Sequence, residues 1–266
     1  PGRVDLVASH FSERECTVES REFRTVTGTY KGKRITVVST GIGCDNIDIV
    51  MNELDALANI DFDTRTVRPT LRQLELVRIG TCGGLQPDTP VGTWVASVKS
   101  IGFDGLLNFY GGRDAVCDLP FEQAFVQHMQ WSGHQCIAHP YVVDADAELI
   151  ARIAGTDMVH GVTVACGGFF GPQGRQLRLP LADPHANEKI ENFTYGGMRI
   201  TNFEMESSAL AGLARLMGHK AMTCCMVIAN LALIHILRCR RIERCRSWLS
   251  PYPYKKKKTH TNEDSK

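Results

Sequence analysis

The segment from Arg78 to Gly84 carries the residue types that bind an oxyanion. It supplies a guanidinium, the hydroxyl of Thr81 and several glycines, and it follows the apolar residues 74–77, which predict a buried strand. A planar cationic fork, a short polar donor and uncovered backbone N–H groups together suit a bound anion. An ordinary glycine-rich turn after a strand is the alternative that this segment alone leaves open.

A second polar segment lies at residues 169–175, after an apolar run that predicts another strand. Gln173 offers both a donor and an acceptor, whereas Arg175 offers only donors. Two such groups, two residues apart on a glycine-containing loop, can recognise a ring with adjacent carbonyl and N–H groups, as a pyrimidine has. Read alone, the same residues are equally consistent with a solvated loop.

The third segment is Glu204-Met205-Glu206, at the predicted start of a helix. A carboxylate accepts hydrogen bonds from two vicinal hydroxyls, and a methionine packs on the apolar face of a sugar. Acidic residues are also favoured at helix starts by the helix macrodipole. A sugar site and a simple helix start are therefore both consistent with this motif.

Strand and helix patterns alternate around these segments. Apolar runs predict strands at residues 33–40, 77–80, 94–98, 159–166 and 222–229. Helical spacing predicts helices at residues 45–59, 121–131 and 204–217, with Asp45 as the N-cap of the first. Strand, glycine turn and helix over residues 33–59 are typical of the first part of a βαβ unit. This order predicts an α/β fold with a largely parallel or mixed central sheet and ligands at the strand ends.

The composition suits one large globular domain, because the 266 residues are 43% hydrophobic and 22% charged. The sequence has no apolar run of transmembrane length, and we expect no signal peptide. Ten cysteines without Cys-x-x-Cys spacing indicate reduced thiols, so we expect a cytoplasmic protein without a metal site. The first residue is Pro1 rather than Met, so we expect that N-terminal residues have been lost.

Charge is unevenly distributed along the chain. Residues 1–230 hold 20 Lys or Arg against 26 acidic residues, whereas residues 231–266 hold ten against three. An acidic body argues against a nucleic-acid partner, and the lack of a long apolar run argues against a membrane partner. Local arginines must therefore hold any anionic substrate. The basic tail is consistent with an amphipathic helix, a disordered tail or non-native sequence from a shifted reading frame or cloning. The abrupt change after a predicted core strand favours the last of these.

In this order, the three segments resemble those of the nucleoside phosphorylase family, most closely the uridine phosphorylases. The resemblance covers residues 1–230 and implies one α/β domain, here incomplete at both ends, whose mixed central sheet forms a distorted barrel flanked by helices. It implies a homo-oligomer, usually a hexamer of dimers, that needs no cofactor. The implied reaction is pentosyl transfer from uridine to inorganic phosphate, giving uracil and ribose 1-phosphate in pyrimidine salvage.

The resemblance also assigns roles to the arginines. Arg3 and Arg78 match phosphate-binding arginines, and Arg21 matches an arginine that reaches the phosphate across a dimer interface. Thr81 matches a ligand of both phosphate and ribose. Glu22 matches a glutamate that in some members helps to hold a monovalent cation between subunits.

The remaining matches concern the nucleoside. Gln173 and Arg175 match the residues that read uracil, and Phe169 matches an aromatic side chain that stacks on it. Met205 and Glu206 match the ribose contacts. The leaving uracil gains negative charge, so donors from the Gln-x-Arg pair stabilise the transition state more than the ground state. We therefore expect these two residues and the phosphate-binding Arg78 to carry catalysis.

Residue 230 bears on the choice of base, and the chain departs from the family pattern directly after it. Asn230 stands where purine-specific relatives have an aspartate that protonates the leaving purine, which favours uridine as the substrate. Leu231 replaces an arginine, and residues 231–266 do not match the family's C-terminal helix. An inactive truncated or frame-shifted relative, a purine nucleoside phosphorylase and a nucleosidase are the alternatives. The matched arginines argue against a nucleosidase, which needs no phosphate site.

Overall fold

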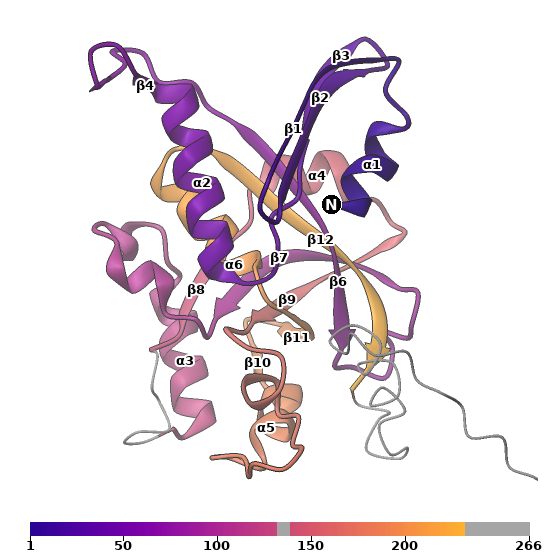
Figure 1. The fold of residues 1–266 in the computed structure, drawn as a ribbon. Helices are drawn as coiled ribbons and strands as arrows, with labels where there is room; N and C mark the ends of the chain where they lie inside the picture. The colour runs from indigo at the N-terminus through magenta and orange to yellow at the C-terminus, as the bar shows by residue number, and fades with distance from the viewer. Residues whose placement is uncertain (132–138, 232–266) are drawn as a thin grey trace, which may run out of the picture.

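A computed structural model describes residues 1–131 and 139–231 of the chain. The predictions for the basic tail therefore lie outside the described residues, except for Leu231. The molecule consists of a closed ring of strands with helices packed around it, and a smaller N-terminal sheet stands beside this ring (Figure 1).

Five strands close into a barrel, which confirms the predicted α/β fold with a mixed central sheet. They are β6 (Glu75–Gly84), β7 (Trp94–Gly102), β9 (Met158–Ala165), β11 (Met198–Glu204) and β12 (Lys220–Asn230). Their spatial order is β6–β12–β7–β9–β11, and β11 pairs again with β6. The β6–β12, β7–β9 and β9–β11 contacts are parallel, whereas the other two are antiparallel. The short strands β8 (Tyr141–Asp144) and β10 (Thr194–Tyr195) pair with β7 and β11 respectively.

The segment from Arg78 to Gly84 is strand along its whole length, so the predicted glycine-rich turn is wrong. β6 pairs with β12 from Glu75, opposite Lys220, as far as Gly84, opposite Asn230. The glycines do not break the strand here, because neighbouring strands supply partners for their backbone groups on both sides of its end.

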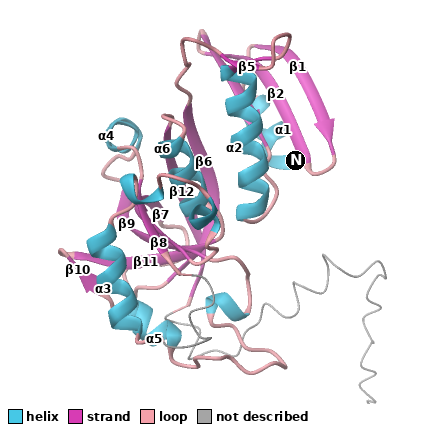
Figure 2. Ribbon diagram, turned by 90° about the vertical axis from the view of Figure 1, so that its left-hand side faces the viewer, coloured by secondary structure: helices cyan, strands magenta, loops and turns pink. Residues whose placement is uncertain are grey.

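Helices pack around the barrel at separate places (Figure 2). Helices α2 (Cys44–Asn59) and α6 (Ser207–Leu216) share one apolar core, which includes Ile47, Met51, Leu210 and Leu213. Helices α3 (Leu119–Met129) and α5 (Ala186–Asn192) contribute to a second, aromatic-rich core that includes Phe121, Phe125, Phe193 and Leu231. Helix α4 (Ala147–Ile153) packs near β7 and β12. No helix in the described part of the chain is long and apolar enough to cross a membrane.

The N-terminal part forms its own antiparallel sheet. Its elements are α1 (Gly2–Ala8), β1 (Glu13–Ser20), β2 (Phe23–Tyr30) and β3 (Lys33–Val38). Since β3 pairs only with β2 and not with the barrel, the βαβ unit predicted for residues 33–59 is wrong. A two-stranded ribbon, β4 (Ile60–Asp61) with β5 (Thr66–Val67), follows α2.

Two helix starts differ from the prediction. Gly43 rather than Asp45 is the N-cap of α2, and Asp45 lies in the first turn. Helix α6 begins only at Ser207, because Glu204 is the last residue of β11 and Glu206 is the N-cap. The acidic motif therefore spans a strand-to-helix junction, which places its two carboxylates at the end of the barrel.

Candidate active site

The guanidinium of Arg78 on β6 is paired with two carboxylates. Its Nη1 atom lies 2.9 Å from Glu204 Oε2, and its Nη2 atom donates to Glu206 Oε2. The three side chains are only 15%, 1% and 7% exposed, in that order. Burial alone would lower the pKa of Arg78, but the charges of Glu204 and Glu206 outweigh it and hold the pKa above its usual value.

Gly80 makes room for this arginine. The Arg78 side chain runs along the strand, and a Cβ on Gly80 would lie only 2.8 Å from its Nη1 atom and 2.8 Å from Cys225 Sγ. A side chain at this position would therefore displace the guanidinium from its carboxylates. The sequence predicted that the glycines expose the backbone to a ligand. In the structure, the missing side chain of Gly80 instead leaves space for the Arg78 guanidinium.

Glu204 is fixed by the first turn of α6. Its carboxylate accepts from the backbone N–H of Glu206 at 2.9 Å, from that of Ser207 at 3.0 Å and from the Ser207 hydroxyl at 2.7 Å. The helix N-terminus therefore stabilises the charge of Glu204. This carboxylate orients Arg78 and has little capacity left for a ligand.

Glu206 connects the arginine to a third segment. Its Oε1 atom accepts from the backbone N–H of Gly43 at 2.7 Å, in the turn before α2. Burial raises the pKa of Glu206; the charge of Arg78 lowers it in part, and that of Glu204 raises it further. Met205 is half-buried between the two glutamates. The two glycines at residues 41–43 predict a break after the strand, and the structure shows that the N–H of Gly43 also binds a carboxylate.

The loop at residues 169–175 forms a compact polar cluster of its own. Nη1 of Arg175 donates to the Phe169 carbonyl at 2.6 Å and to the amide oxygen of Gln173. The guanidinium lies 4.0 Å from the centroid of the Phe169 ring, so it covers one face of that ring. Arg175 donates to the amide oxygen of Gln173, so the amide nitrogen of Gln173 points away from the guanidinium. This nitrogen can donate to another group.

This loop and the Arg78 cluster meet at the ends of the strands. Nη2 of Arg175 lies 3.6 Å from the position that a Cβ on Gly83 would take. Cys166, at the start of the loop, donates its backbone N–H to the Glu204 carbonyl at 2.9 Å. These contacts place Arg78, Glu206, Gln173, Arg175 and Phe169 toward one end of the barrel, and their roles in binding stay predictions.

Other predicted phosphate ligands are not joined to this cluster. Arg3 on α1 is exposed, and so is Arg21, which has a φ of 54° in the β1–β2 turn. Within the described residues neither guanidinium has an ion pair with a carboxylate. Thr81 lies three residues along β6 from Arg78, so its side chain leaves the strand on the opposite face. Their contribution to phosphate binding stays a prediction.

Glu22 lies close to the turn before α2. Its Cγ atom is 3.3 Å from the position of a Cβ on Gly41, so the β1–β2 turn stands beside the segment that holds Glu206. No group of three or more potential metal ligands occurs among the described residues. The cation site predicted near Glu22 stays a prediction.

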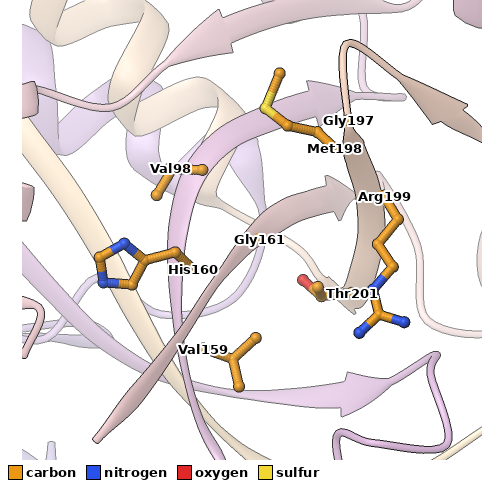
Figure 3. Close-up of a pocket in the computed structure, with 8 residues that line it drawn as sticks. All are labelled: Val98, Val159, His160, Gly161, Gly197, Met198, Arg199 and Thr201. Carbon is orange, nitrogen blue, oxygen red and sulfur yellow. The ribbon is translucent and has the colours of Figure 1, made fainter. Parts of the chain in front are cut away.

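A cavity of about 180 Å³ opens elsewhere on the barrel (Figure 3). His160 and Arg199 line it, near the first residues of β9 and β11. The Gln173–Arg175 loop instead follows the last residue of β9. The cavity therefore lies apart from the cluster of predicted site residues.

The barrel and the pairing of Arg78 with two carboxylates at its end are the features to compare with known proteins. The chain belongs to the Phosphorylase superfamily, whose family model matches residues 1–237. It is 28% identical to a uridine phosphorylase of Thermococcus kodakarensis over 86% of this chain and 70% of the relative. It is 26% identical to a guanosine phosphorylase of Halorubrum lacusprofundi, over 87% of this chain and 76% of the relative. A Trypanosoma brucei nucleoside phosphorylase, reported with uridine phosphorylase activity, matches with a TM-score of 0.74 and 28% identity over 86% of this chain and 82% of its own.

Proposed function

We propose that the protein catalyses phosphorolysis of uridine to uracil and ribose 1-phosphate. One observation carries the proposal: Glu204 and Glu206 hold the Arg78 guanidinium, and the Glu204 carbonyl accepts from the backbone N–H of Cys166, which leads into the loop where Arg175 orients the amide of Gln173. An anion ligand, a diol acceptor and two base-reading side chains thus share one end of the barrel. The names of the relatives, which include uridine and guanosine phosphorylases, support the reaction class more strongly than the base.

The residues have separable roles in this reaction. Glu206 accepts hydrogen bonds from the ribose hydroxyls and fixes the sugar, while Arg78 holds the phosphate close to C1′. The bond between C1′ and the base nitrogen breaks as the sugar becomes oxocarbenium-like. Gln173 and Arg175 donate to the base, whose negative charge grows as it leaves, and a donor that strengthens in the transition state accelerates the step.

The preference for uridine rests on the Gln173–Arg175 pair. The amide nitrogen of Gln173 and the guanidinium of Arg175 can donate to the two carbonyl oxygens of a uracil ring. The Gln173 amide oxygen, which accepts one bond from Arg175, has a second lone pair for the uracil N–H. A purine phosphorylase is the second candidate, since relatives named guanosine phosphorylase and purine nucleoside phosphorylase match at 26–27% identity. Uridine, inosine and guanosine assayed side by side distinguish the two candidates.

The assay measures base release from each nucleoside with and without inorganic phosphate. Uracil release that requires phosphate is expected. Equal rates without phosphate would indicate a nucleosidase, and faster release from guanosine or inosine would reassign the substrate. A folded chain that cleaves none of the three nucleosides would show that it is an inactive relative.

We further propose a homodimer formed through the outer face of α2, because apolar residues are exposed there next to the site. Ile42 is 72% exposed, Ile49 on α2 is 43% exposed, and Phe109 is 89% exposed. Phe109 belongs to this face, because the neighbouring Tyr110 hydroxyl donates to Asp48 of α2. A dimer through this face would bring a second copy close to the turn that holds Glu206, as a phosphate ligand from the partner requires. Analytical ultracentrifugation of the protein and of Phe109→Asp tests it, and an unchanged mass would refute it.

A further inference from the structure

The charges around Arg78 do not favour a phosphate in the ligand-free protein. Its two terminal nitrogens are each paired with a carboxylate, Glu204 on one side and Glu206 on the other. Glu204 is compensated separately by the first N–H groups of α6. Glu206 receives one backbone N–H, from Gly43, so most of its charge is directed at Arg78. A phosphate that approaches Arg78 therefore meets a buried negative charge that already occupies the same guanidinium.

We infer that Glu206 competes with phosphate for Arg78, and that a bound ribose relieves this competition. The inference rests on the proposed function, since it assigns the diol to Glu206 and the anion to Arg78. It adds that the two ligands bind cooperatively, and that one carboxylate determines the coupling.

The geometry explains the direction of the coupling. An ionised carboxylate can accept about four hydrogen bonds, and those from Gly43 and Arg78 leave capacity for two vicinal hydroxyls. Two added donors draw the carboxylate charge toward the sugar and weaken its attraction for Arg78. Because linkage is reciprocal, phosphate strengthens nucleoside binding by the same factor.

This role makes a prediction opposite to that of a purely structural ion pair. If Glu206 merely positioned Arg78, its loss would weaken phosphate binding. If Glu206 competes with phosphate, Glu206→Gln strengthens phosphate binding in the absence of nucleoside. The amide still accepts the Gly43 N–H, so the turn before α2 keeps its partner.

The test uses the full chain and calorimetric titration with inorganic phosphate. Glu206→Gln is expected to bind phosphate roughly tenfold more tightly than the wild-type protein, a typical size for coupling between sites. Asp45→Asn is the matched control, because it removes one exposed negative charge two residues from Gly43 without contact to Arg78. It should change phosphate affinity by less than about twofold, since exposed charges are screened.

A second measurement needs no variant and remains informative if Glu206→Gln fails to fold. Pseudouridine and formycin contain the ribose diol, but a carbon–carbon bond joins their ribose to the base. Phosphorolysis does not cleave this bond. Whichever of the two binds should raise the affinity of the wild-type protein for phosphate, and phosphate should raise its affinity in return. Weaker phosphate binding by Glu206→Gln, or independent binding of phosphate and C-nucleoside, overturns the inference. Failure of the proposed function is seen separately, as absence of phosphate-dependent cleavage while the phosphate titrations still respond to Glu206→Gln.

Discussion

Asn230 at the end of β12 donates its side-chain amide to the carbonyl oxygen of Gln86 at 2.9 Å. The same nitrogen donates to the carbonyl of Thr89, also at 2.9 Å, and the side chain is buried. Asn230 therefore fixes the turn after β6, a structural role that is separate from the choice of base. The sequence alone predicts only that this position distinguishes pyrimidine from purine chemistry, because its two carbonyl partners are not visible there.

Asn230→Asp is expected to destabilise the protein by about 2 kcal/mol, because a carboxylate would face two buried carbonyl oxygens without a donor. It should not create activity toward inosine. Denaturant unfolding measures the first effect, and base release from inosine measures the second. Asn108→Asp is the control, since Asn108 also donates to a carbonyl but is exposed; it should cost less than about 0.5 kcal/mol. Efficient inosine cleavage by Asn230→Asp would show instead that residue 230 determines the choice between pyrimidine and purine.

Gly80→Ala is expected to remove phosphate binding, because the added methyl group would occupy the space of the Arg78 guanidinium. The clash with Cys225 should also destabilise the fold by about 1–3 kcal/mol. Calorimetric titration with phosphate and thermal unfolding measure the two effects. Gly111→Ala is the matched control, since a Cβ there meets no atom within 4 Å. Normal phosphate binding by Gly80→Ala would show that Arg78 is not the anion ligand.

Gln173→Ala and Arg175→Ala are expected to lower kcat for uridine by roughly 10²-fold to 10³-fold, the usual effect of losing a donor to developing charge. Gln173 is buried and accepts from Arg175, so each substitution should also cost about 1 kcal/mol of stability, much less than its effect on the reaction. Steady-state kinetics with uridine and phosphate provide the measurement. Arg178→Ala, which changes an exposed arginine three positions beyond Arg175, should leave kcat unchanged. If kcat were retained and only KM rose, the pair would bind the base without stabilising it as it leaves.

Patterns local in sequence account for much of the fold. Apolar runs located β7, β9 and β12, and helical spacing located α2 and α3, each to within a few residues except at the end of β7. Strand β1 was not predicted, because all of its residues are exposed and burial therefore imposes no apolar–polar alternation on them. Strand β11 was not predicted, because it carries the polar residues Asn202 and Glu204. Both are buried in the barrel and hydrogen-bonded there, so the strand lacks the apolar pattern of a buried strand.

The candidate site was predictable only in parts. The Gln173–Arg175 pair was recognised because the two residues lie on one loop. The pairing of Arg78 with Glu206 joins residues 128 positions apart and depends on how β11 crosses the end of β6. The role of Gly80 could not be predicted either, because it follows from the path of the arginine side chain rather than from the backbone.

The pH dependence of stability should depend on the contact between Asp118, at the start of α3, and Lys99 of β7 in the barrel. Asp118 is the N-cap of α3, accepts from the Phe121 N–H at 3.1 Å and pairs with Lys99 Nζ at 2.7 Å. Partial burial alone would raise the pKa of Asp118, but the bonds from Lys99 and Phe121 outweigh it and lower the pKa below 3.8.

A carboxyl whose pKa is lower in the folded state stabilises the fold above its unfolded pKa, and this contribution is lost as the pH falls through the folded value. Asp118→Asn should therefore be less stable than the wild-type protein at pH 7, with the difference shrinking below about pH 3.8. Since asparagine is as good an N-cap as aspartate, the substitution isolates the charge. Unfolding free energies measured between pH 2.5 and 7 provide the test. A stability difference that stayed constant over this range would show that the ion pair with Lys99 contributes nothing.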